Sequence, residues 1–165
     1  MEQTELDTPQ VLHGRSAYAA KALELVRAAH SELLLYSDVL DRAFYGGEEF
    51  AEAVKQFVLG NQRAHLQVLV NQGQQARHSV PHLLELWRHL SSRIEFREPA
   101  EHQRENFRGE WLIADRRTLL ERTTPEALES KFWAQAPRHG KVRGDEFEAC
   151  WNEGQPSPEL RSLGI

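Results

Sequence analysis

The sequence has few cysteines, no long apolar run and no apolar segment at its start. Its single cysteine, Cys150, excludes an internal disulfide. Its longest apolar runs, residues 33–35 and 68–70, are far shorter than the roughly 20 residues that a membrane-spanning helix needs. The acidic start, residues 1–5, lacks the apolar segment of a secretory signal. These absences predict a cytoplasmic protein that does not span a membrane.

The sequence also lacks an excess of positive charge, because its 20 Lys and Arg are outnumbered by 25 Asp and Glu. The formal net charge is −5 and the isoelectric point is about 5.9, which argues against a protein that coats nucleic acid non-specifically. The charge is unevenly distributed, because residues 93–143 hold eleven Lys or Arg and nine Asp or Glu. The sequence therefore permits a weak, local basic surface in its C-terminal half.

What is present suits one globular domain. The chain has 165 residues, of which 40% are hydrophobic and 27% are charged, so it can bury a core without disulfides or metal ions. We predict a flexible tail over residues 1–14, one domain over residues 15–154, and a second tail, containing Pro and Ser, over residues 155–165.

Hydrophobic spacing gives the order of the expected elements. Apolar residues at helical spacing predict helices over residues 17–27, 48–58 and 81–90. Short apolar or alternating runs predict strands over residues 32–37, 65–70, 93–97, 111–115 and 118–122. The last two strands would form a hairpin, residues 123–141 would be irregular, and Asp145 would cap a final helix over residues 144–151. This order implies an α/β fold, in which helices flank a mixed, largely parallel sheet.

Four segments in this order carry a family resemblance. They are the apolar strand over residues 32–37, the helix and strand over residues 50–70, the strand over residues 111–115, and Phe147-x3-Trp151. Together they resemble one half of a phospholipase D superfamily protein, and the likeness covers roughly residues 15–153. The chain is similar to small bacterial domains with this layout and no clear motif. The resemblance implies the family's α/β fold.

The family's H-x-K-x4-D motif is degenerate in this chain. In the family, the motif histidine attacks phosphorus, a second histidine protonates the leaving group, and lysines hold the phosphate oxygens. Asp115 matches the aspartate, but Arg108 occupies the histidine position and Glu110 the lysine position. Arginine stays protonated and cannot be the nucleophile, while glutamate repels phosphate. Arg122-Thr123 also replaces the Gly-Ser that follows the motif, so the resemblance implies a pseudoenzyme.

A second H-x-K pattern gives an alternative catalytic site. His139 and Lys141 have this spacing, with Glu146 instead of an aspartate seven residues after the histidine. The residues between them do not have the pattern of a buried strand, so nothing directs the two side chains into a cleft. We favour a polar loop here and keep His139 and Lys141 as the alternative catalytic candidates.

Basic side chains gather around the predicted hairpin. They could contact the phosphates of RNA or DNA. The somewhat favoured alternative is a solvated surface paired with nearby acids, namely Glu98, Glu101, Glu105, Glu121 and Glu126. Trp133 is the best candidate for an exposed aromatic anchor, because it lies in the segment expected to be irregular. The candidate binding residues are Arg104, Arg108, Arg116, Arg117, Arg122, Trp133, Arg138, Lys141 and Arg143.

Two further patterns are possible sites. His82, Glu85 and His89, with His78 nearby in sequence, share one helical face and could hold a metal ion, but exposed polar positions are the favoured interpretation. Cys150 is expected to be a small buried apolar residue and not a nucleophile. No metal and no cofactor is assigned.

These observations predict a non-catalytic phospholipase D-like module that binds or regulates a protein or a nucleic acid, RNA included. The alternative is a phosphodiesterase or nuclease that uses a non-standard histidine site. Single-motif members of the family pair into dimers, so the resemblance also implies a homodimer.

Overall fold

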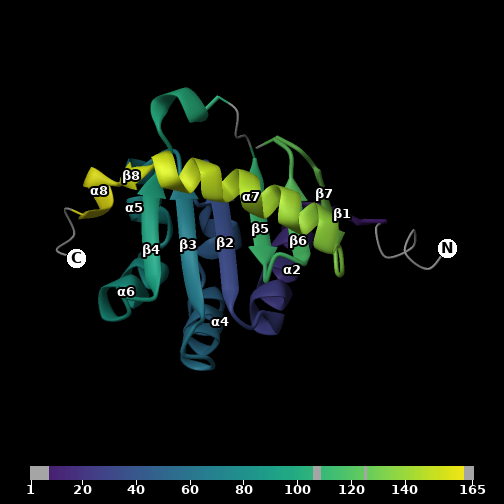
Figure 1. The fold of residues 1–165 in the computed structure, drawn as a ribbon, viewed down its shortest axis with the longest axis horizontal. Coiled ribbons are helices and arrows are strands. Elements are labelled where there is room, and N and C mark those ends of the chain that lie inside the picture. The colour runs from purple at the N-terminus through teal and green to yellow at the C-terminus, as the bar shows by residue number, and fades with distance from the viewer. Residues whose placement is uncertain (1–7, 106–108, 125, 162–165) are drawn as a thin grey trace.

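The computed structural model describes residues 8–105, 109–124 and 126–161, which form one sheet with helices on both faces (Figure 1). The strand order is β1-β7-β6-β5-β2-β3-β4-β8. The strands are β1 (Gln10–His13), β2 (Glu32–Ser37), β3 (His65–Val70), β4 (Ile94–Glu98), β5 (Glu110–Ala114), β6 (Thr118–Arg122), β7 (Glu129–Trp133) and β8 (Gln155–Pro156). The helices are α2 (Arg15–Ala28), α3 (Arg42–Tyr45), α4 (Glu48–Leu59), α5 (Gly73–Ser79), α6 (Pro81–His89), the 3-10 turn η1 (Glu101–Gln103), α7 (Pro137–Glu153) and α8 (Pro158–Arg161). Across the described residues, every helix is too short or too polar to span a bilayer.

Most neighbouring strands are antiparallel. Among the described strands, β2–β3 and β3–β4 are parallel, and the other five pairs are antiparallel. The predicted mixed α/β sheet with flanking helices is therefore confirmed, but the prediction that the sheet is largely parallel is wrong. The reason is topological: β5 returns antiparallel to β2, and short connections then add β6 and β7, which must alternate in direction.

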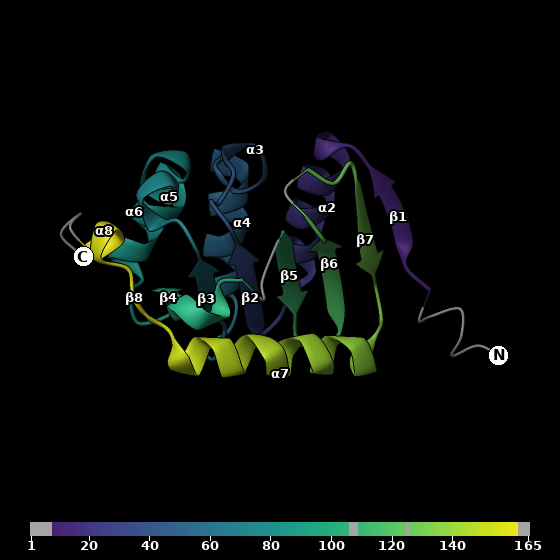
Figure 2. The ribbon, with the colours of Figure 1, turned by 90° about the horizontal axis from the view of Figure 1, so that it is seen from above.

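The central strand β2 separates two cores. Leu33 and Leu35 face one core, which α2, α4 and α6 complete, while Leu34 and Tyr36 face the other core beneath α7. Figure 2 shows these layers: α7 crosses one face of the sheet, and α2 to α6 cover the opposite face. Burial on both faces explains why the sequence of β2 is a nearly continuous apolar run.

Residues 123–141 contain regular structure that the sequence did not predict. Strand β7 pairs with β6 on one side and with β1 on the other. Helix α7 begins at Pro137, whose fixed φ suits the first turn of a helix. Asp145 lies inside this helix, so its predicted role as the cap is wrong.

The sequence does not predict the first half of α7, because Gly140 and Gly144 lower its helix propensity. In the structure they let the helix pass close to the turn between β5 and β6. A Cβ atom on Gly140 would lie 2.4 Å from the carbonyl oxygen of Arg116, and one on Gly144 would lie 2.9 Å from the Arg116 side chain. Close packing, and not intrinsic propensity, explains both residues.

The sheet extends beyond the predicted domain of residues 15–154 at both ends. Strand β1 pairs with β7 along all four of its residues, and β8 pairs with β4. Ser157 and Leu160 are fully buried, so the chain after residue 154 packs onto the domain. Residues 1–7 and 162–165 of the predicted tails lie outside the described residues.

Candidate functional site

The two motif residues that the structure describes lie at opposite edges of the sheet. Strands β2, β3 and β4 end at one edge, here named the carboxyl edge, and begin at the other, the amino edge. Strand β5 runs the other way, so Glu110, at its start, lies at the carboxyl edge beside Ser37. Asp115 follows the end of β5 and therefore lies at the amino edge.

Glu110 is enclosed at the carboxyl edge. Its exposed fraction is 4%, and Ser37 Oγ donates a hydrogen bond of 2.5 Å to Glu110 Oε1. Burial raises the pKa of the Glu110 carboxyl to about 7, although hydrogen bonds from Ser37 and Tyr45 act in the opposite direction. Glu110 therefore titrates near neutral pH inside the protein.

Neighbouring polar groups extend this buried site to two helices and to β6. Tyr45 hydrogen-bonds Glu110, and its Oη atom lies 2.8 Å from Tyr18 Oη. Burial raises the pKa of both tyrosines well above the usual range. Arg122 pairs across the strands with Glu110, and its guanidinium carbon lies 5.2 Å from the centre of the Phe44 ring. The set is named the Glu110 cluster: Tyr18, Ser37, Tyr45, Glu110 and Arg122.

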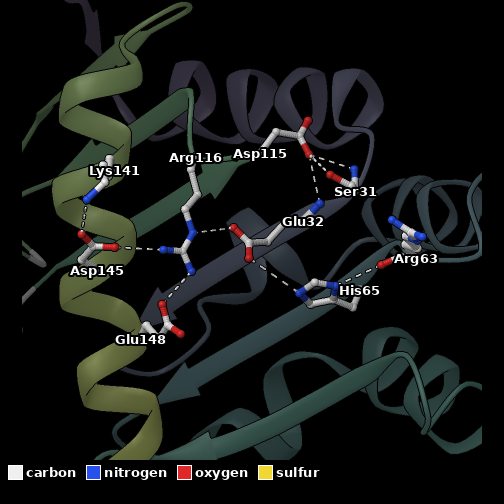
Figure 3. A network of polar contacts seen from close by, with 9 residues as sticks. All are labelled: Ser31, Glu32, Arg63, His65, Asp115, Arg116, Lys141, Asp145 and Glu148. Carbon is white, nitrogen blue, oxygen red and sulfur yellow. Dashed lines mark hydrogen bonds and ion pairs between the residues drawn. The ribbon is translucent and has the colours of Figure 1, made fainter.

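Asp115 holds the start of β2 (Figure 3). Its carboxylate accepts hydrogen bonds from the backbone N–H groups of His30 (3.0 Å), Ser31 (2.8 Å) and Glu32 (3.0 Å), and from Ser31 Oγ (3.0 Å). Burial alone would raise the pKa of Asp115, but these hydrogen bonds outweigh it and lower the pKa. The one motif residue that matches the family therefore has a structural task in this chain.

Arg116 connects the same turn to α7 (Figure 3). Its guanidinium donates to Glu32 (2.9 Å), Asp145 (3.0 Å) and Glu148 (3.1 Å). His65 Nε2 lies 3.7 Å from the other oxygen of Glu32, which raises the pKa of His65. Both Asp115 (φ 54°) and Arg116 (φ 53°) have left-handed backbone, which the tight turn requires and for which arginine has no preference. The hydrogen bonds of both side chains compensate for this strain.

A protein-family model, described as "Domain of unknown function (DUF7931)", matches residues 14–163, which is most of the chain. The chain belongs to the DUF7931 family. No curated protein sequence matches it.

Solved structures share the fold of the DUF7931 chain at low sequence identity. TrmBL2, an archaeal chromatin protein whose structure shows a novel mode of DNA binding, has a TM-score of 0.66 and 16% identity, over 92% of this chain and 55% of TrmBL2. The DUF7931 chain thus spans about half the length of TrmBL2. Nuc from Salmonella typhimurium, a phospholipase D family member, has a TM-score of 0.59 and 14% identity, over 90% of this chain and 98% of Nuc. NucT from Helicobacter pylori has a TM-score of 0.61 and 7% identity, over 91% and 99% of the two chains. These likenesses show a phospholipase D-like fold.

Most of the predicted basic binding residues of the DUF7931 chain already have partners within it. Besides Arg116, Arg143 contacts Glu121 (3.0 Å) and Glu146 (3.1 Å), and Lys141 contacts Asp145 (3.1 Å). Arg104 lies 3.8 Å from Glu98, and Arg122 is buried in the Glu110 cluster. Glu98 and Glu121 are among the acids expected as partners, but Glu121 is buried, so its pair with Arg143 does not belong to a solvated surface.

The remaining predicted basic residues differ from these. Arg117 and Arg138 are exposed and form no ion pair with another described residue. Arg108 lies outside the described residues. The structure brings Arg116 and Lys141 together at Asp145, on one side of α7. Arg143 lies on the other side of the helix, beside Glu121, and Arg104 and Arg122 lie elsewhere, so the set does not form one continuous surface.

Trp133 is not an exposed anchor. It is 8% exposed, because it lies in β7 and faces α7, where its ring centre is 4.6 Å from that of His139. The error follows from predicting residues 123–141 as irregular.

The side chains of the alternative catalytic pair, His139 and Lys141, do not point toward a common site. His139 and Lys141 are two residues apart on α7, which places them on roughly opposite sides of the helix. His139 Nε2 lies 3.9 Å from Glu121 Oε2, whereas Lys141 binds Asp145. The polar loop expected here is wrong, since both residues are helical.

The histidines of α6 and Cys150, the other possible sites in the sequence, show no arrangement for metal binding or catalysis in the described residues. His82 Nε2 lies 3.8 Å from Glu48, and His89 Nε2 lies 3.1 Å from Glu85. No group of three or more His, Cys, Asp or Glu in the described ranges is arranged to hold a metal ion. Cys150 is buried as predicted, and burial raises the pKa of its thiol to about 11.

Sequence reasoning missed the Glu110 cluster as a unit. The motif comparison located Glu110 but not its burial. A signal was available, because Glu110 alternates with Leu112 and Ala114 and therefore shares their buried face of β5. Tyr18 and Tyr45 are distant in sequence, and no local pattern connects them to Glu110.

Proposed function

We propose that the DUF7931 chain is a non-catalytic, phospholipase D-like module that binds or regulates a partner. The burial of Glu110 carries this proposal. The position of a phosphate-binding lysine in the family motif holds an acid here, and that acid is hydrogen-bonded to Ser37 inside the protein. A carboxyl group at this position repels phosphate, and its burial turns the group away from ligands. Arg108 at the nucleophile position supports the same proposal from the sequence alone.

A protein partner is favoured over a nucleic acid. Phosphate groups would have to displace the carboxylates that already bind Arg116, Lys141 and Arg143. The DNA binding of TrmBL2 is described for that protein, of which this chain spans about half, and it makes DNA or RNA the other outcome of the test.

Filter binding of labelled RNA and DNA at low and high salt tests this preference. We expect weak retention at low salt and none at high salt. The double variant Arg117→Gln/Arg138→Gln removes the two candidate residues that, within the described part of the chain, form no ion pair, and Lys55→Gln is the matched control. Tight retention with a steep salt dependence, lost in the double variant only, would establish nucleic-acid binding instead.

The alternative function is a phosphodiesterase centred on His139. The proximity of Glu121 to His139 favours it, since a carboxylate can orient an imidazole, but the nearest lysine in sequence lies on another side of α7. Hydrolysis of bis(p-nitrophenyl) phosphate and of single-stranded DNA tests it, with wild type beside His139→Ala. We expect neither protein to exceed a heat-denatured blank. Turnover that His139→Ala abolishes would overturn the non-catalytic proposal.

A homodimer and a cytoplasmic location belong to the same proposal. The dimer is inferred from the family resemblance, and the location from the single cysteine. Light scattering over a concentration series checks the first, with a mass of twice 19.0 kDa expected. A constant monomer mass would contradict it.

A further inference from the structure

A groove between α2 and α4 lies away from the Glu110 cluster and from α7. Both helices pack on the face of the sheet opposite α7 (Figure 2). Both end at the amino edge, because β2 follows α2 and β3 follows α4 in the chain. The groove has a volume of about 900 Å³, which lies at the upper end of the range for ligand sites. Its apolar lining comes from Ala29, which is partly exposed, and from Val26, Ala53 and Phe57, which are at most 6% exposed.

The charged groups of this groove are separated by sign along its length. Arg27, from the end of α2, and Arg63, from the loop after α4, lie at the amino edge. Glu49 and Glu52 come from the first half of α4, and the helical rise from them to Gly60 is about 12 to 16 Å. One end of the groove is therefore basic and the other acidic.

These four side chains are exposed and can pair with an external charged group. None of them forms an ion pair with another described residue, whereas Arg116 and Arg143 each contact two or more acids. Glu52 Oε1 accepts a hydrogen bond of 2.9 Å from Gln56 Nε2, on the next turn of α4. A ligand that carries both charges, separated by the same span, would pair with both ends at once.

We propose that the groove between α2 and α4 binds a short peptide with free termini and small apolar side chains. Its ammonium group would face Glu49 and Glu52, and its carboxylate would face Arg27 and Arg63. An extended chain advances about 3.3 Å per residue, so four or five residues match the span between the two ends. The apolar side chains would lie over Ala29 and over the aliphatic stems of the charged residues that line the groove. This proposal is independent of the proposed function, since it uses none of the same residues.

Calorimetric titration with the tetrapeptide Ala-Val-Ala-Leu tests the proposal, using the free peptide, its N-acetylated form and its C-amidated form. We expect the free peptide to bind, and each blocking group to weaken binding by about fivefold, because each removes one partly screened ion pair. The double variant Glu49→Gln/Glu52→Gln should become indifferent to acetylation only. The double variant Arg27→Gln/Arg63→Gln should become indifferent to amidation only.

Two controls make the result specific to the groove. Lys55→Gln on α4 and Glu126→Gln in the loop before β7 remove exposed charges that do not line it, and both should bind every peptide as wild type does. The absence of binding by the free peptide at millimolar concentration would overturn the proposal. Equal binding of the free and blocked peptides would overturn it as well, since the terminal charges would then not be recognised.

Discussion

At the carboxyl edge of the sheet, Glu110 is 4% exposed and is hydrogen-bonded by hydroxyl groups, whereas at the amino edge Asp115 accepts hydrogen bonds from three backbone N–H groups. The two acids are five positions apart in sequence, yet their pKa values shift in opposite directions. Desolvation dominates at Glu110, and fixed N–H dipoles dominate at Asp115. The same residue chemistry thus gives an acid that titrates near neutral pH at one edge and a stable anion at the other.

This contrast explains why one matching motif residue does not imply activity. Asp115 binds the backbone at the start of β2, which is a structural task that requires no catalysis. Glu110 occupies the position where the family chemistry needs a cation, and its surroundings suit an acid instead.

The largest expected effect comes from restoring the family's lysine with Glu110→Lys. The new ammonium would be buried beside Arg122 in place of a carboxyl group, so we expect a loss of about 3–5 kcal/mol in the free energy of unfolding, measured in urea. Glu110→Gln, which keeps the shape without the charge, is the matched control. Equal stability of the two variants would mean that the carboxyl edge is open enough to hold a lysine.

The next effect is the pH dependence of stability that Glu110 causes. The pKa of Glu110 is about 7 in the folded protein, against 4.5 as its ordinary value, so its stabilising contribution is complete below about pH 4.5 and is lost as the pH rises through 7. The difference in unfolding free energy between wild type and Glu110→Gln should fall by roughly 3 kcal/mol between pH 4 and 8. A difference that does not vary with pH would show that Glu110 is not desolvated.

A somewhat smaller loss is expected for Asp115→Ala. The backbone N–H groups of His30, Ser31 and Glu32 would lose their shared acceptor, which should cost about 2–3 kcal/mol in chemical denaturation. Asp145→Asn, which removes one exposed partner of Arg116, should cost less than about 1 kcal/mol. If the two variants lost the same stability, the amino edge would depend on surface pairing and not on the hydrogen bonds to the start of β2.

The smallest effect belongs to His65. Its pKa is raised by Glu32, so the pair contributes fully below about pH 6.5, and the contribution is lost as the pH rises through the raised value. Because His65 is partly exposed, we expect His65→Gln to remove well under about 1 kcal/mol at pH 6 and nothing at pH 9. Thermal unfolding at both pH values checks this, and an equal effect at both would exclude the ion pair as its cause.

The spacing of hydrophobic residues predicted those helices and strands in which buried residues recur at the helical or strand period. Strand β2, the amphipathic helix α4 and the β5–β6 hairpin were found in this way. Helix α7 was missed at its first half, because Gly140 and Gly144 are there for close packing against a turn more than 20 positions earlier. The largely parallel sheet was wrong for a similar reason, since the direction of β5 depends on a long connection that short-range spacing does not describe.

The candidate site also has a part that the sequence predicts and a part that depends on tertiary packing. The identity of Glu110 and Asp115 could be read from motif spacing, and several ion pairs could be anticipated from the density of acids near the arginines. The chain from Glu110 through Tyr45 to Tyr18, and the burial of Trp133, depend on how α2, α3 and β7 pack, which no single segment encodes.

The most direct test is a titration of the Glu110 carboxyl carbon by NMR, assigned with Glu110→Gln and repeated with inorganic phosphate. A buried, non-catalytic position predicts a midpoint near 7 that phosphate does not change. A midpoint near the ordinary 4.5, or one that moves when phosphate is added, would mean that Glu110 is open to ligands and would contradict the account.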